Sequence, residues 1–492
     1  MNKDELCLAI DQGSLSSRAL VIDAAGATVV SAQCAVASRY LDADKVEQDP
    51  VELLNSVRRV IDECVQQLGA RAESIGRAGL ATQRSSIVGW SRVDGQALTS
   101  VISWQDRRAA SWLWQFRAHT DRVHNITGLV LSPHYGASKM AWCIANEPKL
   151  RSSLEKNELA LAPLSSFLLF NLLDEQPFLV DPANASRTLL WDYQRGDWSS
   201  DLLQLFGVPR AALPRCVPSR FAFGSLTVGD RKVPLGVVTG DQSAALFAFG
   251  EPAADTVYAN LGTGAFLQQI VGEEPVSAGP FLSSVVHQEE ARSVYVVEAT
   301  VNGAGSAIKQ VSGELGLHLV RQESMAVEWL ETVKRPLLFL NGVSGLAAPW
   351  WIDSFESQFI GNGDIPESMV AVYESIIFLL CTNLNELALY VERPRRVIMT
   401  GGLAQIDPLC QRLADLSMIK VCRPVIHEAT AVGLAWLQGA GHPEFKSAEF
   451  DEFVPRPAEE SHEFLERYEL WLSAMETAVE AQQLAASATE SA

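Results

Sequence analysis

No two cysteines and no two histidines of the 492-residue chain have the sequence spacing of a metal-binding or disulfide motif. Its eight cysteines stand singly, without a CxxC motif, so the sequence indicates neither a zinc site nor a disulfide framework, and we expect buried reduced thiols. Its eight histidines never occur at metal-ligand spacing. The sequence therefore argues against the zinc-dependent and the disulfide-stabilised classes of protein.

The chain also lacks any run of five or more lysines and arginines, and its formal net charge is −20. Such a chain repels phosphate backbones and anionic membrane surfaces, so we predict no nucleic-acid partner and no membrane contact. The N-terminal MNKDELCLAI has no apolar signal core. The longest uncharged stretch, 159–173, is broken by Pro163 and two serines, so we interpret it as a buried helix. We expect a cytoplasmic protein.

Neither a Walker A sequence nor a GxGxxG fingerprint is present, which removes the main support for P-loop and Rossmann folds. What is present is 48% hydrophobic and 20% charged residues, a composition typical of a soluble globular enzyme. The length predicts two or three domains. Strand-like runs alternate with long helical patterns, which indicates the α/β class.

The stretch DQGSLSSR, residues 11–18, lies between two apolar runs and predicts a β-hairpin with a polar tip. The segment TVYANLGTGAFLQQIV, residues 256–271, has the same design. Two such hairpins predict a duplicated fold with a cleft between the copies, the second domain beginning near residue 246. The alternatives are chance similarity of the two hairpins and an ordinary solvated turn at the first.

Helical patterns accompany these hairpins. Asp49 and Pro50 predict a helix start, and Glu52 predicts a capping box. The buried face of that helix is predicted from residues three or four apart, namely Val51, Leu54, Val57, Ile61, Val65 and Leu68. A second long helix is expected from residue 367, and the acidic last fifty residues are expected to form a tail with a frayed end.

Two glycine-bearing turns suit phosphate, because backbone N–H groups, hydroxyls and an arginine can cradle it together. The first turn offers Gly13, Ser14, Ser17 and Arg18, and the second offers Gly262, Thr263 and Gly264. Asp11 could hold Mg²⁺, which favours a few carboxylates plus substrate phosphates. Asp241 could take the proton of an attacking hydroxyl in a phosphoryl transfer. The alternative for Asp241 is an N-cap to the helix that follows it.

Nine motifs occur together in a fixed order, and their order and spacing resemble those of the FGGY family of carbohydrate kinases. Within that family the glycerol kinases are the most similar, over about residues 5 to 475. The motifs are DQGSLSSR, GLATQRSSIVGW, ISWQDRRA, TGLVLSPHYGASKMAW, NASRTLLWD, GDQSAALF, LGTGAF, GLAAPWW and the glycine pair of MTGGLA.

The resemblance implies an α/β fold with two ribonuclease H-like domains of the actin and hexokinase type, flanking a central cleft. We expect an N-terminal domain over 1–245 on the acceptor side, a C-terminal domain over 246–445 on the nucleotide side, and a helical tail over 446–492. It also implies that ATP and Mg²⁺ are used and that the partner is a small polyol or sugar. A homodimer or a homotetramer would fit the family.

Site residues follow from the same resemblance, position by position. Asp241 matches the catalytic base, and both Asp11 and Asp241 match the magnesium side of the site. Positions lining the nucleotide are matched by Gly13, Ser14, Ser17, Arg18, Gly262, Thr263, Gly305, Gly401 and Gly402. Positions lining the acceptor pocket are matched by Arg84, Ser85, Trp104, His134, Gln242 and Phe266, with Asp241 at its edge.

The chain departs from glycerol kinases at two acceptor positions. Ser85 stands where they carry a glutamate, and His134 stands where they carry a tyrosine. Loss of a buried hydrogen-bonding partner costs about 1–3 kcal/mol, which argues against glycerol as the substrate. The smaller Ser85 would admit a larger polyol or a sugar. His134 is open to two interpretations, a new hydrogen-bonding partner or a wall residue.

We therefore predict an ATP-dependent kinase that phosphorylates a hydroxyl of a polyol or sugar. The rival hypothesis is a non-catalytic nucleotide- and sugar-binding sensor that has kept the kinase fold. Asp11 and Asp241 argue against the rival, because a binding module needs no catalytic base. An actin-like filament protein is disfavoured by the matched acceptor positions. Nucleotide preference stays open, because Ile406 and Asp407 replace two asparagines usual in glycerol kinases.

Overall fold

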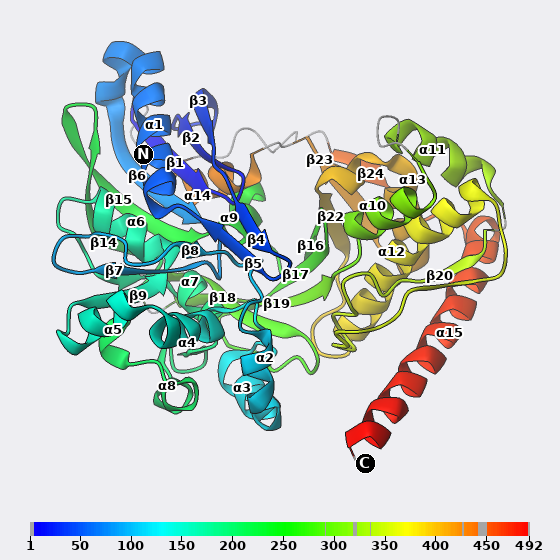
Figure 1. The fold of residues 1–492 in the computed structure, drawn as a ribbon. Helices are drawn as coiled ribbons and strands as arrows, with labels where there is room; N and C mark the ends of the chain where they lie inside the picture. The colour runs from blue at the N-terminus through cyan, green and yellow to red at the C-terminus, as the bar shows by residue number, and fades with distance from the viewer. Residues whose placement is uncertain are drawn as a thin grey trace.

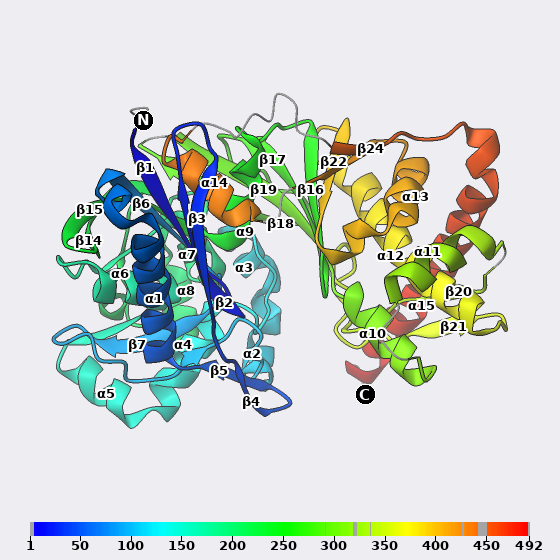
Figure 2. The ribbon, with the colours of Figure 1, turned by 90° about the horizontal axis from the view of Figure 1, so that it is seen from above.

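The computed structural model describes residues 4–290, 292–317, 322–334, 336–425, 428–440 and 450–490. Thirteen strands of this part of the chain form one long sheet, in the order β24-β23-β22-β16-β17-β19-β18-β14-β15-β6-β1-β2-β3. Two bodies lie side by side along this sheet, the first blue to green and the second green to red (Figures 1 and 2). We call them the first half and the second half.

The first half-sheet begins with the predicted hairpin. Three antiparallel strands are followed in space by two strands parallel to the first one, in the order β3-β2-β1-β6-β15. The strands are β1 (Leu6–Gln12), β2 (Ser16–Ile22), β3 (Thr28–Ala35), β6 (Ile75–Thr82) and β15 (Arg231–Gly240).

The second half-sheet repeats this arrangement in the order β19-β17-β16-β22-β23. Its strands are β16 (Thr256–Leu261), β17 (Ala265–Gly272), β19 (Arg292–Val301), β22 (Arg396–Thr400) and β23 (Lys420–Pro424). The two predicted hairpins, β1–β2 and β16–β17, occupy corresponding places. The duplication predicted from the hairpins is therefore confirmed.

Two further strands join the half-sheets. β14 (Arg220–Val228) pairs with β15, and β18 (Leu282–Glu289) pairs with β19. β14 and β18 meet each other only at Arg220 and Glu289. A smaller sheet in the first half contains β4 (Arg39–Asp42), β5 (Lys45–Gln48), β8 (Val101–Ile102), β7 (Ile87–Ser91) and β9 (Leu159–Pro163).

The predicted helix at residue 50 is α1 (Pro50–Leu68), and the Asp49 carboxylate accepts the N–H groups of Val51 and Glu52. The predicted capping box is only half present, because the Glu52 carboxylate accepts the Ala37 N–H instead. Val51 is 55% exposed, so its predicted burial is wrong. A first-turn residue can point away from the core even when its spacing fits.

The interpretation of 159–173 as one buried helix is wrong. Its first five residues form β9, and α6 (Leu164–Leu172) begins directly after Pro163. Both pieces are almost fully buried, so apolar character alone could not separate strand from helix. Other helices of the first half are α2 (Ala110–Leu113), α3 (Thr120–Thr127), α4 (Gly136–Asn146), α5 (Pro148–Glu155), α7 (Pro182–Ala185) and α8 (Ser200–Phe206).

The second half has a large apolar core around α12 (Ile365–Leu387), the long helix predicted from 367. α12 is long and apolar enough to cross a membrane, but 83% of its most apolar window is buried inside the protein. Its neighbours are α10 (Gly305–Glu314), α11 (Gln322–Thr332), α13 (Asp407–Ser417) and α15 (Ala458–Glu490). The expected tail is not purely helical, because β24 (Phe450–Phe453) first pairs with β23.

Two helices cross at the junction of the halves. α9 (Asp241–Ala245) follows β15, and α14 (Ala429–Leu437) follows β23 but packs on β1 and β6 of the first half. A Cβ atom at Gly433 of α14 would overlap the carbonyl group of Ala244 in α9. The two helices therefore approach as closely as backbones allow, and they place Asp241 at the junction.

Candidate active site

The β1–β2 turn rests on three buried glutamines that the sequence analysis did not identify. Gln83 Nε2 donates to Gln48 Oε1 at 2.9 Å and to Gln12 Oε1 at 3.2 Å. Gln48 Nε2 donates to the carbonyl oxygen of Ser14 at 3.0 Å, and Gly13 N donates to Ser16 O at 3.0 Å. This network fixes the backbone of the first proposed phosphate turn.

Ser14 lies next to the predicted acceptor pocket. Trp104 Nε1 donates to Ser14 Oγ at 2.8 Å, and Ser14 Oγ lies 3.5 Å from Gln83 Oε1. A residue predicted for the nucleotide and a residue predicted for the acceptor thus touch each other. This contact is the geometry expected where two substrates meet.

The Ser17 side chain lies in the core. Its side chain is fully buried, and its hydroxyl lies 2.7 Å from the Ser56 hydroxyl on α1. Successive side chains of a strand point to opposite faces, so Ser17 faces the core while Arg18 faces the other way. The nucleotide role predicted for Ser17 stays a prediction, and its hydroxyl is already paired with that of Ser56.

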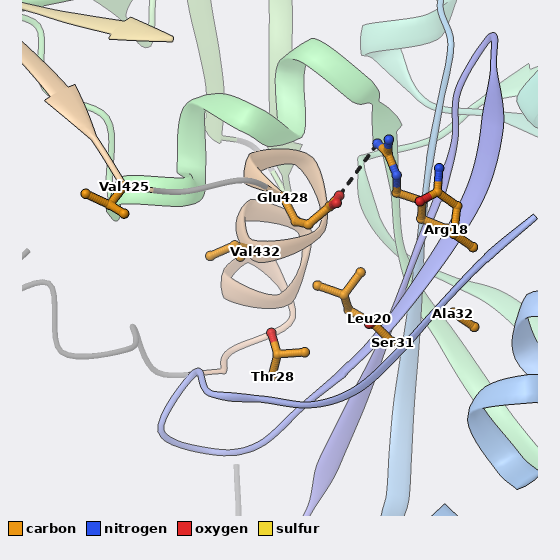
Figure 3. A pocket seen from close by; sticks show the side chains of 9 residues that line it. Arg18, Leu20, Thr28, Ser31, Ala32, Val425, Glu428 and Val432 are labelled. Carbon is orange, nitrogen blue, oxygen red and sulfur yellow. Dashed lines mark ion pairs between the residues drawn. The ribbon is translucent and has the colours of Figure 1, made fainter. Parts of the chain in front are cut away.

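Arg18 reaches across to the second half. Its Nη1 lies 3.6 Å from Glu428 Oε2, just before α14, and both side chains are about one-third exposed. Figure 3 shows this pair at the rim of a cavity, with Leu20 below it and Val432 of α14 opposite. Arg18 thus has a carboxylate as its partner at the place proposed for a phosphate.

Asp11 and Asp241 form a pair of carboxyl groups at the junction. Asp11, on β1, is 7% exposed, and its Oδ1 has no hydrogen-bond partner in the described part of the chain. Burial, and then the nearby Asp241, raise the pKa of Asp11 to about 7. Burial also raises the pKa of Asp241, against the opposing charge of Arg84. Two carboxyl groups held in this way are ready to accept a cation.

The N-cap interpretation of Asp241 is wrong, because Gly240 is the N-cap of α9 and Asp241 is its first residue. The Asp241 carboxylate accepts the N–H of its neighbour Gln242 at 2.7 Å. A Cβ atom at Gly240 would overlap the side chain of Arg84. Glycine at this position therefore lets Arg84 approach Asp241.

Arg84 holds the centre of the predicted acceptor pocket. Its Nε lies 3.9 Å from Asp241 Oδ1, and its Nη2 donates to Gln242 Oε1. Burial, and then the neighbouring Arg187, lower the pKa of Arg84 to about 10, which leaves it charged at neutral pH. Its Nη1 is buried and has no partner among the described residues. Arg84, Asp241 and Gln242 are thus brought together as predicted.

Two charged residues that the sequence analysis missed complete this cluster. Glu298 of β19 accepts from Arg187 Nη1 at 3.2 Å and Nη2 at 2.9 Å, and its Oε2 lies 3.8 Å from Arg84 Nη2. Arg187 and Arg84 outweigh burial and lower the pKa of Glu298. A lone glutamate in the apolar run VYVVEATV was the available signal, because charges are seldom buried without a partner.

Ser85 and His134 flank Arg84 and Trp104. Ser85 has a φ of +63° in the left-handed region, and its buried hydroxyl has no partner among the described residues. The His134 ring lies edge-on to Trp104, with centroids 5.5 Å apart. Burial and the surrounding cations hold the pKa of His134 well below its usual value, so its imidazole is neutral.

The second glycine turn gathers the other predicted nucleotide residues. Gly305 N donates to Gly262 O at 3.0 Å, and Ser306 N donates to Thr263 O at 2.9 Å, which ties the turn to the start of α10. A Cβ atom on Gly305 would lie 2.7 Å from Gly262 O. These backbones are close enough to require glycine at position 305.

Gly401 and Gly402 lie beside this turn, because the parallel strands β16 and β22 end next to each other. A Cβ atom on Gly401 would overlap the backbone of Leu261, whereas the space around Gly402 is open. Phe266 is half-buried on β17, opposite Thr300. Within the described residues, no hydrogen bond or ring contact joins Phe266 to the Arg84 cluster, or the second glycine turn to the first.

Curated glycerol kinases are similar to this chain along most of its length. The glycerol kinase of Alcanivorax borkumensis is 33% identical over 444 residues, covering 88% of this chain and 89% of that protein. The glycerol kinase of Thermus brockianus is 32% identical over 495 residues, covering 96% and 98%.

Solved structures agree in fold. The glycerol kinase of Plasmodium falciparum, solved with ADP, superposes with a TM-score of 0.86 at 23% identity, covering 96% of this chain and 98% of that one. The gluconate kinase of Lactobacillus acidophilus gives a TM-score of 0.84 at 19% identity, covering 96% and 98%. At these identities the likeness establishes the two-domain α/β fold. It does not indicate which acceptor this chain phosphorylates.

Two family models account for most of the chain. The N-terminal domain model of the FGGY family of carbohydrate kinases matches residues 6–248, and its C-terminal domain model matches residues 257–442. With a duplicated α/β fold and relatives that are ATP-dependent kinases of polyols or sugars, this chain belongs to the FGGY family of carbohydrate kinases.

Proposed function

We propose that this kinase transfers the γ-phosphoryl group of MgATP to a hydroxyl of a polyol or sugar larger than glycerol, with Asp241 as the catalytic base. The observation that carries the proposal is the cluster at the junction, where Asp241 lies 3.9 Å from Arg84 and close to Asp11. One base, one cation site and two phosphate turns are sufficient for phosphoryl transfer, because the enzyme mainly positions the reactants and neutralises charge.

The acceptor would bind against the Arg84 cluster. Arg84 would donate hydrogen bonds to its hydroxyl groups, and Gln242 would donate to them or accept from them. Trp104 and His134 would form one wall. Ser85 and Phe266 complete the proposed pocket. The nucleotide would bind along both glycine turns, with Gly13, Ser14, Arg18, Gly262, Thr263, Gly305, Gly401 and Gly402 as the proposed contacts.

Asp11 and Asp241 would hold Mg²⁺. The fit rests on the buried, unpartnered Oδ1 of Asp11 and on the raised pKa of both carboxyl groups, which a cation would lower. No cluster of three or more acidic, histidine or cysteine side chains lies in the described part of the chain, which suits an ion held mostly by phosphates and water. When bound, Mg²⁺ neutralises charge on the transferred phosphoryl group.

Asp241 would accept the proton of the attacking hydroxyl. Its Oδ1 is held by the Gln242 N–H, which leaves the second oxygen for that proton. Closure of the two halves would exclude water, so that the acceptor rather than water attacks the phosphate. We expect ADP release without acceptor to be at least about 100-fold slower than with it.

Ser85 and His134 are the reason for placing glycerol last among the acceptors. A serine hydroxyl cannot replace the charged acceptor that a glutamate offers, and its small side chain leaves more room. The names of similar structures include xylulose and gluconate kinases as well as glycerol kinases, so the fold accommodates longer substrates. A cytoplasmic location and a homodimeric or homotetrameric assembly complete the proposal.

The test is ADP release from purified protein with MgATP and a panel of glycerol, erythritol, pentitols, ketopentoses and hexoses. Asp241→Asn should reduce acceptor-dependent release by at least about 1,000-fold while ATP binding changes little. Asp230→Asn, on the exposed β14–β15 turn, is the matched control. Normal turnover by Asp241→Asn would refute the role of Asp241. Tight ATP binding without release for any acceptor would favour the sensor hypothesis.

A further inference from the structure

Lys139 is the most buried lysine near the site and plays no part in the proposed reaction. It lies on α4, its side chain is 1% exposed, and no carboxylate of the described residues lies within ion-pair distance. Fully buried lysines are rare unless they are paired. Any role of Lys139 must therefore come from its hydrogen bonds and not from an ion pair.

Those hydrogen bonds go to the two positions at which the acceptor pocket departs from glycerol kinases. Lys139 Nζ donates to the carbonyl oxygen of Ser85 at 3.0 Å and to that of His134 at 2.6 Å. Ser85 and His134 belong to segments far apart in the sequence. One ammonium group thus joins two separate walls of the pocket.

The backbone at Ser85 and at His134 requires such a hydrogen bond to hold its position. Ser85 has its backbone in the left-handed region, which a non-glycine residue adopts only when its surroundings hold it there. His134 is packed between Trp104 at 5.5 Å and Tyr135 at 5.0 Å between ring centroids, and its carbonyl oxygen accepts from Lys139 Nζ. Lys139 therefore positions the main chain of both walls through its two hydrogen bonds.

The charge of Lys139 is not needed for this task. Burial lowers the pKa of Lys139 to about 7, with Arg107 and Arg108 acting in the same direction and Asp106 against them. An uncharged amine keeps two N–H groups, one for each carbonyl oxygen. Both bonds can therefore persist on either side of neutral pH.

We propose that Lys139 is a positioning residue that sets the distance between the Ser85 and His134 walls and thereby decides which acceptors fit. The inference rests on the proposed function, because it concerns the acceptor pocket of that kinase. Lys139 touches neither substrate in this account. Its effect is on acceptor binding and acceptor choice, and not on the chemistry at Asp241.

The test compares Lys139→Met with Lys149→Met, an exposed lysine on the neighbouring helix α5. Methionine keeps the apolar stem and removes the donors. We expect KM for the best acceptor to rise at least tenfold, kcat to change less than threefold, and ADP affinity to change less than twofold. The order of acceptors by kcat/KM should also change. Lys149→Met should match the wild type in every respect.

Lys139→Ala provides a second test that does not depend on the methionine variant. n-Propylammonium has the length of the deleted side chain and should restore acceptor KM, whereas tetramethylammonium at equal concentration, which has no N–H donor, should not. An unchanged KM and acceptor order in Lys139→Met overturns the inference, as does lack of rescue in Lys139→Ala. If the wild type releases no ADP with any acceptor, the proposed function fails and the inference fails with it.

Discussion

The carboxyl group of Asp11 is held in an environment that disfavours its charge. Its pKa rises from 3.8 to about 7 on folding, mainly because the group is buried and next because Asp241 is near. Between these two values the folded protein binds more protons than the unfolded chain. The free energy of unfolding therefore falls as pH rises from about 4 to about 7, and the full loss is present above that window.

Asp11→Asn should remove this loss. We expect the ligand-free variant to be more stable than the wild type by about 1–2 kcal/mol at pH 8, and by less at pH 5. Urea unfolding at both pH values measures the difference. Asp62→Asn, on the exposed face of α1, is the control and should change stability little at either pH. A less stable Asp11→Asn at pH 8 would contradict the assigned environment.

The ion pair between Arg18 and Glu428 competes with any phosphate at Arg18. Exposed pairs of this kind contribute about 0.2–1 kcal/mol, so Glu428→Gln should tighten MgADP binding by about twofold to fivefold. Titration of MgADP measures this. Glu289→Gln, which removes the partner of Arg220 at 2.8 Å away from the glycine turns, should leave the affinity unchanged. Weaker MgADP binding by Glu428→Gln would mean that Arg18 does not serve the nucleotide.

Single residues could be assigned from the sequence where chemistry and motif agreed. Asp11, Arg84 and Asp241 are brought together as expected, although their roles remain proposals. The burial of the Ser17 hydroxyl could have been predicted from its place on a strand, since Ser17 alternates with Arg18. The partners of Glu298, and Ser85 as a partner of Lys139, could not be predicted, because they lie in segments that only folding brings near them.

Among the helices, α15 contributes most directly to a core that precedes it in the sequence. Trp471 is fully buried against α12, and its Nε1 donates to Phe339 O at 2.8 Å. Figure 1 shows α15 along the outer side of the second half. The C-terminal segment is thus an integral part of that half.

Trp471→Ala should lower the free energy of unfolding by about 3–5 kcal/mol, because it leaves a large cavity and an unpaired carbonyl. Thermal unfolding measures this loss. Trp114→Ala provides the comparison, since Trp114 is 60% exposed and its replacement should cost less than about 1 kcal/mol. Equal effects of the two substitutions would show that α15 is only loosely attached.

Elements were predictable where a cap or a turn marks their ends. The β1–β2 and β16–β17 hairpins and the start of α1 were placed correctly, because glycine, aspartate and proline fix those backbones. Segment 159–173 failed, since burial on all sides removes the periodicity that separates β9 from α6. β24 left no clear signal for a different reason, because it has only four residues and none of them is buried.

The two halves of the molecule depend on the close crossing of α9 and α14. Gly433→Ala would push its Cβ into the carbonyl group of Ala244, so that the helices must separate and Asp241 must move. We expect a loss of about 2–4 kcal/mol in stability and at least a tenfold loss in kcat. Thermal unfolding and ADP release measure the two effects.

Gly313→Ala is the matched control, a helical glycine with open space around it on α10. It should raise stability by about 0.5–1 kcal/mol, because alanine is the better helix former. Full activity of Gly433→Ala would show that the crossing does not position the base.

The duplication was predictable at this level, because each half opens with the same kind of hairpin. The join through β14 and β18 was not, since a single residue pair leaves no pattern in the sequence. The predicted boundaries at 245 and 445 remain predictions. α14 makes them harder to define, because it follows a strand of the second half and packs on the first.

Because α14 comes late in the sequence but packs on the first half, the core of the first half is completed only late in synthesis. The face formed by Cys7, Ala9, Ala81 and Val237 is covered by Ala431, Leu434 and Ala435 of α14. On the ribosome, the first half leaves the exit tunnel well before residue 429 is made. Its apolar face stays open to water during that interval, when exposed apolar surface promotes aggregation. Slower translation of the second half would therefore lower the yield of native enzyme, although no contact in the finished protein changes.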